Sequence, residues 1–126
     1  MSLRSPLGRV RGLGASRHGT QHFLQQRFTA ILLVPLVLWF VASLLLTNPA
    51  DHGEVVRWMR SPLNAVLLLL LIGNVFHHGQ LGIQVVFEDY IGSEWQKVTA
   101  IILLRMISLL AFVAATICVL RVFLGY

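Results

Sequence analysis

The sequence predicts an all-α integral membrane protein with three transmembrane helices. Of its 126 residues, 56% are hydrophobic and only 12% are charged, whereas soluble domains average about 45–50% apolar residues even with glycine counted. Three apolar segments approach or exceed the roughly 20 residues that a helix needs to cross a bilayer. They lie at residues 28–46, 63–87 and 98–124. We therefore expect a single membrane domain over residues 28–126, preceded by a basic arm at residues 1–27.

Local signals support the limits of the first two segments. The first contains Pro35, which neighbouring helices tolerate in a membrane span with a kink, and it ends before Thr47. Ser61 and Pro62 precede the second segment and suit an N-cap followed by the first helical position. The connections at residues 48–61 and 88–97 are predicted to be loops. A single cysteine, Cys118, excludes a disulfide framework within this chain.

The distribution of basic residues predicts the orientation. The arm before the first span carries five arginines and no acidic residue, whereas residues 48–61 balance two arginines with two acids. The positive-inside rule then places the N-terminus in the cytoplasm and, after three spans, the C-terminus in the periplasm. An organellar transit peptide is also Arg-rich and acid-poor. We expect instead a retained arm, a bacterial inner-membrane location, and no nucleic-acid partner.

Polar residues on the second span indicate chemistry. Charged or hydrogen-bonding side chains are costly in hydrocarbon and usually functional there. At about 100° per residue, one helix face carries His78 and the residues that follow it at helical spacing. This stripe consists of Leu71, Asn74, His78, Gly82, Val85 and Asp89. A histidine beside a glycine gap is the arrangement that an axial haem ligand requires.

His77 points about 100° away from His78. Two adjacent helical histidines cannot clasp one iron from opposite sides, so a bis-histidine haem would need its second ligand from another chain. Helix geometry alone also permits interhelical hydrogen bonding or a proton path, and it favours these over haem ligation. Tyr90 is by itself most simply an aromatic anchor at the membrane interface, as is Trp95.

The run from His78 to Tyr90, HGQLGIQVVFEDY, resembles the H-x-x-x-G-x-x-x-x-x-x-D-Y signature of the small membrane-anchor subunit of succinate dehydrogenase, respiratory complex II. The stretch HFLQQRFTA at residues 22–30 is similar to the segment that enters the first span in that family. The chain length and the three spans match as well. The resemblance covers nearly the whole chain, and its specificity rests mainly on the spaced His, Gly, Asp and Tyr.

The resemblance implies roles for individual residues. His78 would be one axial ligand of a haem b shared with the large cytochrome b anchor subunit. Tyr90 would donate a hydrogen bond to a ubiquinone carbonyl oxygen, with Asp89 supporting it or supplying protons. If the helix is unbroken, His78 and Tyr90 lie roughly 18 Å apart along its axis. Arg27 and His22 would stabilise a haem propionate, although Arg27 could equally complete the cytoplasmic basic belt. Arg105 could pair with Glu88 or Asp89.

The implied complex also contains a flavoprotein and an iron–sulfur subunit, so this polypeptide would not oxidise succinate itself. Its expected share is anchoring, one haem ligand and one wall of the quinone site. Three alternatives stay open. They are the anchor of a fumarate reductase, an anchor that has lost its haem, and a small proton-coupled transporter that uses Glu88, Asp89 and Arg105.

Overall fold

The computed structural model describes residues 19–126, which form four α-helices. Helix α2 spans Gly19–Leu46, α3 spans His52–Arg60, α4 spans Pro62–Tyr90 and α5 spans Glu94–Leu124. The three long helices are apolar and long enough to cross a membrane. The predicted all-α architecture with three spans is therefore confirmed for this part of the chain. Residues 1–18, which hold most of the predicted basic arm, lie outside the described residues.

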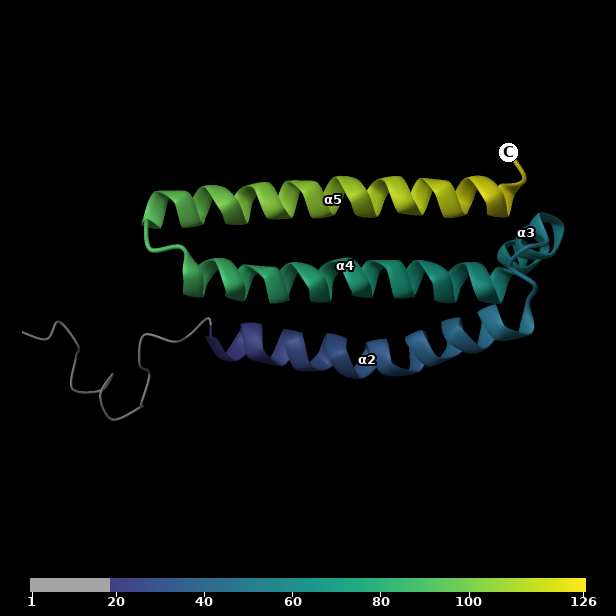
Figure 1. The fold of residues 1–126 in the computed structure, drawn as a ribbon, viewed down its shortest axis with the longest axis horizontal. Coiled ribbons are helices and arrows are strands. Elements are labelled where there is room, and N and C mark those ends of the chain that lie inside the picture. The colour runs from purple at the N-terminus through teal and green to yellow at the C-terminus, as the bar shows by residue number, and fades with distance from the viewer. Residues whose placement is uncertain (1–18) are drawn as a thin grey trace, which may run out of the picture.

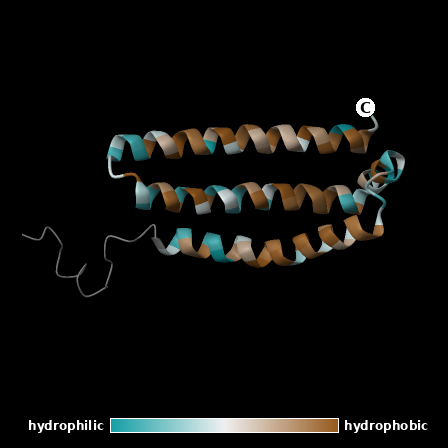
Figure 2. Ribbon diagram, in the orientation of Figure 1, coloured by the Kyte–Doolittle hydropathy of each residue, from teal (hydrophilic) through white to brown (hydrophobic). Residues whose placement is uncertain are grey.

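The long helices form a flat layer with α4 in the middle (Figure 1). Helix α4 packs against α2 on one side and against α5 on the other, and so separates α2 from α5. The few buried side chains reflect this arrangement, because most of them belong to α4: Ala65, Leu68, Leu71, Asn74 and Leu81. Most other apolar side chains are exposed. Brown, hydrophobic residues make up most of the three long helices in Figure 2.

Helices α2 and α5 begin earlier than the apolar segments that predicted them. Helix α2 starts at Gly19, so His22 and Arg27 lie within it rather than in an irregular arm. Helix α5 starts at Glu94, after Ser93 as its N-cap residue. Polar first turns extend a helix beyond the hydrocarbon core, where hydropathy no longer detects it. Pro35 lies inside α2, which bows along its length in Figure 1.

The prediction that residues 48–61 form a loop was wrong, because this segment contains α3. Asp51 caps α3, its carboxylate accepting hydrogen bonds from the backbone N–H groups of Gly53 and Glu54 at 2.8 and 3.2 Å. Trp58 on α3 stacks on Trp39 of α2, with ring centroids 5.7 Å apart. The guanidinium Nε of Arg60 donates to the backbone oxygen of Val122 at 3.2 Å. Helix α3 thus ties together the ends of α2 and α5.

The connection between α4 and α5 is also shorter than predicted. Glu88, Asp89 and Tyr90 form the last turn of α4, and only residues 91–93 lie between the two helices. The start of α2 lies at the same end of the layer as the end of α4, whereas α3 and the C-terminus lie at the other end (Figure 1). The predicted site residues of α2 and those at the end of α4 therefore face the same side of a membrane.

Candidate functional site

A groove between α2 and α4 brings together three of the predicted site residues, His22, Arg27 and His78. Its volume is about 570 Å³, which is within the range of cofactor-sized sites. The other lining residues come from both helices and are mostly apolar or small: Phe23, Gln26, Ala30, Gly82 and Val85. The extension of α2 to Gly19 creates this groove, since it places His22 and Arg27 beside α4.

The residues of the predicted stripe on α4 lie on one face of the helix, and most of this face is turned toward α2 and the groove. Leu71 and Asn74 are buried at its N-terminal end. His78, Gly82 and Val85 follow and line the groove. Asp89, at the far end of the stripe, is exposed and does not line it. The stripe therefore divides into a buried part that holds the helices together and an open part that could hold a ligand.

Two polar contacts join α2 and α4 at the level of His78. The hydroxyl oxygen of Thr29 lies 2.9 Å from His78 Nδ1, and Asn74 Nδ2 donates to the backbone oxygen of Thr29 at 2.9 Å. Thr29 and Asn74 are both buried. Within residues 19–126, the second ring nitrogen of His78, Nε2, has no hydrogen-bond partner. Among the described residues, the ring is thus held through one nitrogen, and no group occupies the other.

The composition of the groove fits one side of a haem. Among the described residues, a Cβ atom added at Gly82 would meet only Gln26 Nε2, at 3.9 Å, so the rest of the described chain leaves this wall of the groove open. His22 Nε2 is buried and has no hydrogen-bond partner within the described part of the chain, which is unusual for a buried polar atom. The Arg27 guanidinium lies 5.1 Å from the centroid of the Phe23 ring. Two imidazoles, of His78 and His22, and the guanidinium of Arg27 therefore line a groove with a glycine in its wall.

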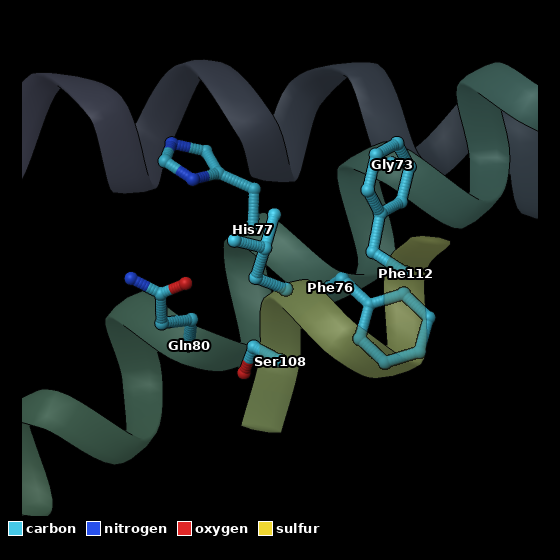
Figure 3. A pocket seen from close by; sticks show the side chains of 7 residues that line it. Gly73, Phe76, His77, Gln80, Ser108 and Phe112 are labelled. Atoms are coloured by element: carbon cyan, nitrogen blue, oxygen red, sulfur yellow. The ribbon is translucent and has the colours of Figure 1, made fainter. Parts of the chain in front are cut away.

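His77 lies in a different groove, between α4 and α5 (Figure 3). This smaller cavity of about 230 Å³ is lined by Gly73, Phe76, His77 and Gln80 of α4 and by Ser108, Leu109 and Phe112 of α5. It shares no lining residue with the His78 groove. The two histidines therefore diverge as helix geometry predicts. No cluster of three or more His, Cys, Asp or Glu side chains forms a metal site among residues 19–126.

Glu88, Asp89 and Tyr90 lie exposed at the end of α4, and Tyr90 is 85% exposed. Because α4 is unbroken from His78 to Tyr90, the two residues are separated by roughly 18 Å along the axis. Asp89 was predicted to lie in a loop. It lies instead in the last turn of α4. Trp95, at the start of α5, is also largely exposed.

Arg105 does not pair with an acidic residue, contrary to the suggestion from the sequence. Its guanidinium donates to Gln84 Oε1 at 3.4 Å, and Gln84 Nε2 donates to Glu88 Oε1 at 2.8 Å. The glutamine therefore links the cation to the carboxylate across the α4–α5 interface. The only ion pair within residues 19–126 joins Lys97 and Glu94.

Sequence reasoning missed Thr29, Phe23 and Gln26 as site residues. A signal was available, because His22, Gln26 and Thr29 recur at helical spacing from the predicted arm into the first residues of the apolar span. Assigning residues 19–27 to an arm concealed this periodicity. The polar face becomes apparent only when the helix is extended to Gly19.

Comparison with known proteins assigns the family. Residues 1–120 match the family described as succinate dehydrogenase/fumarate reductase transmembrane subunit. The succinate dehydrogenase hydrophobic membrane anchor subunit of Rickettsia bellii is 33% identical over 116 residues, which cover 92% of this chain and 93% of the relative. That of Rickettsia felis is 31% identical over 105 residues, 80% of this chain and 87% of the relative. The succinate dehydrogenase membrane anchor subunit of Reclinomonas americana is 29% identical over 97 residues, 75% of this chain and 81% of the relative.

Proposed function

This chain belongs to the succinate dehydrogenase/fumarate reductase transmembrane subunit family as a membrane anchor of succinate dehydrogenase, and on that basis we propose that it provides one axial ligand of a haem b and one wall of the ubiquinone site. The anchor would lie in a bacterial inner membrane, with its N-terminus in the cytoplasm and its C-terminus in the periplasm. It would assemble with a large cytochrome b anchor, an iron–sulfur subunit and a flavoprotein. Succinate would be oxidised on the flavoprotein and not on this chain.

The haem proposal rests on the hydrogen bonding of the two ring nitrogens of His78. Its Nδ1 contacts Thr29, while its Nε2 has no protein partner within residues 19–126 and the ring lines an open groove. Haem b, when bound, would transfer single electrons, and its second ligand would come from the large anchor. Arg27 and His22 line the same groove. A guanidinium is suited to stabilise the carboxylate of a propionate there.

The quinone proposal rests on the end of α4. Reduction of a quinone to a quinol needs a hydrogen-bond donor at a carbonyl oxygen and access to protons. The Tyr90 phenol is such a donor, and its exposure leaves it free to face a partner subunit. Asp89, exposed in the same turn, has access to water and would support proton delivery. We infer that partner subunits complete the site around these two residues.

Adjacent histidines provide a matched test of the haem assignment. We expect His78→Ala to abolish or strongly perturb the reduced-minus-oxidised haem bands of the purified complex, because it removes the iron ligand. His77→Ala should leave the bands unchanged, since His77 lies in the other groove. An unchanged spectrum in the His78→Ala complex would refute ligation by this residue. A wild-type complex without haem bands would identify the chain as a haem-free anchor.

The quinone assignment is tested separately with Tyr90→Phe, which removes only the hydroxyl. We expect succinate-to-ubiquinone turnover to fall by about 10–100-fold, the range that a loss of roughly 1.4–2.7 kcal/mol of transition-state stabilisation produces. Electron transfer to a soluble acceptor should stay intact, because the flavoprotein is untouched. Unchanged quinone reduction would exclude this role for the hydroxyl.

The two functional alternatives receive different support. The family includes fumarate reductase subunits, but the curated relatives above are named for succinate dehydrogenase, which favours that direction. A proton-coupled transporter needs a carboxylate within a span. All acidic residues from 19 to 126 lie in α3 and its cap or at the facing ends of α4 and α5. No observation favours the transporter.

A further inference from the structure

Thr29 occupies an unusual position between a helix backbone and a histidine ring. Its side-chain oxygen lies 2.8 Å from the backbone oxygen of Gln25, 3.1 Å from that of Gln26 and 2.9 Å from His78 Nδ1. The residue is buried, with 6% of its surface exposed. A hydroxyl has one proton to donate and two lone pairs that accept, while a carbonyl oxygen only accepts.

These numbers of donors and acceptors determine the direction of each hydrogen bond. The two carbonyl oxygens compete for the single hydroxyl proton, and the shorter contact is to Gln25. When the proton is donated there, the Thr29 oxygen presents a lone pair to His78 Nδ1, which must then carry a hydrogen as the donor. The opposite arrangement would withdraw the hydroxyl proton from both carbonyls. The contacts therefore favour the tautomer of His78 that is protonated on Nδ1.

We propose that Thr29 is a positioning residue that fixes the Nδ1–H tautomer of His78 and thereby keeps the Nε2 lone pair available for iron. This inference rests on the haem ligation proposed above. In the neutral ring only one nitrogen carries a hydrogen, so a hydrogen on Nδ1 leaves Nε2 as the acceptor. A residue of α2, Thr29, thus determines the tautomer of a histidine on α4.

Asn74 holds Thr29 in place. Its Nδ2 donates to the Thr29 backbone oxygen at 2.9 Å, from the buried part of the α4 stripe and one helical turn before His78. Thr29 is therefore bound to α4 by its backbone as well as by its side chain. In a medium of low dielectric constant these bonds are stronger than they would be in water. The pair sets the register of α2 against α4 at the level of the ring.

The proposal predicts the direction of an electronic effect. A ligating histidine that donates its other N–H to an acceptor is oriented and made more basic by that bond. A more basic ligand stabilises ferric iron more than ferrous iron, so loss of the acceptor should raise the midpoint potential of the haem. Removal of such partners elsewhere typically lowers metal affinity about 10–100-fold. If Thr29 only fills space, its hydroxyl should affect neither the midpoint potential nor the affinity for the haem.

The experiment compares Thr29→Val and Thr29→Ser in the assembled four-subunit complex. Valine keeps the shape and removes the hydroxyl, whereas serine keeps the hydroxyl. We expect the haem of the Thr29→Val complex to have a higher midpoint potential in an optical redox titration, with altered low-spin g values in its electron paramagnetic resonance spectrum. Thr29→Ser should restore both values toward wild type. Thr99→Val is a matched control, because the Thr99 hydroxyl also donates to the i−4 carbonyl oxygen, of Trp95 at 2.8 Å, and has no hydrogen bond to a histidine among residues 19–126.

Each result decides the question. A Thr29→Val complex with the wild-type potential and g values overturns the proposal while leaving haem ligation by His78 intact. If Thr29→Val loses the haem and Thr29→Ser retains it, the requirement for the hydroxyl is supported directly. If both variants lose the haem, the residue acts through packing and the proposal fails. Failure of the underlying ligation is recognised independently, because His78→Ala would then keep the wild-type spectrum.

Discussion

Gly82→Ala tests whether a flat cofactor lies against α4 beside His78. Among residues 19–126 the substitution meets no steric obstacle, because the nearest atom to a new Cβ there is Gln26 Nε2, at 3.9 Å. It also replaces a poor helix former with the best one, a gain of about 1 kcal/mol in an exposed helix interior. Considered alone, the chain should therefore tolerate the change or be slightly stabilised by it. Any loss must come from something that occupies the groove.

The expected loss follows from the cost of overpacking. Inserting one methylene or methyl group into a filled site typically costs about 1–3 kcal/mol. At about 1.4 kcal/mol for each factor of ten, this range corresponds to a decrease of roughly 5–150-fold in haem affinity. Gly79→Ala provides the control, since no other part of residues 19–126 comes within 4 Å of a Cβ added there and Gly79 does not line the His78 groove. The helix-propensity gain is the same in both variants.

The measurement is the haem content of each purified complex, determined as pyridine haemochrome per mole of complex and followed during dilution into apomyoglobin as a haem acceptor. Gly82→Ala should lose haem faster and more completely than wild type, whereas Gly79→Ala should match wild type. Equal retention by both variants would show that no cofactor contacts Gly82, and the groove would then need another occupant.

Three further predictions concern the contacts that hold the layer together. Asn74→Leu should destabilise the assembled complex by about 0.6–1.7 kcal/mol, the range of single hydrogen bonds between membrane helices, as measured by unfolding in SDS; an unchanged midpoint would show that the bond to the Thr29 backbone contributes nothing. Asp51→Ala should cost about 1 kcal/mol of local stability in α3, seen as roughly fivefold faster amide hydrogen exchange in its first turn, whereas Glu54→Gln should leave that exchange within about twofold of wild type. Arg60→Met should release the end of α5 and speed exchange of its last-turn amides, and protection equal to wild type would contradict the contact with Val122.

The three spans could be predicted from the sequence because hydropathy measures what crossing a bilayer requires. Helix α3 could not be found in that way, since it is short and has charged residues on one side. Its capping residue Asp51 and its terminal arginines, Arg57 and Arg60, were nevertheless signals of a helix. The true start of α2 was hidden for a related reason, because residues 19–27 are mostly polar and lie where an arm was expected.

The α4 face of the candidate site could be predicted because it depends on one periodicity within one helix. Leu71, Asn74, His78, Gly82 and Val85 lie on a common face as expected. The α2 face depends on the register between two helices, which helix geometry does not specify. Thr29 was quoted as part of a motif, yet its contact with His78 spans 49 positions in the sequence. The assignment of Tyr90 and Asp89 to a quinone site stays a prediction.

A layer one helix thick has no interior of its own. With so few side chains buried, and with large apolar groups exposed on all three long helices, the chain gains little free energy by folding in isolation. Its stability should consequently grow with the amounts of its neighbours in the membrane, as mass action requires of a subunit whose folding and association are one equilibrium. Synthesis in excess of those neighbours would leave the surplus chains as substrates for membrane proteases.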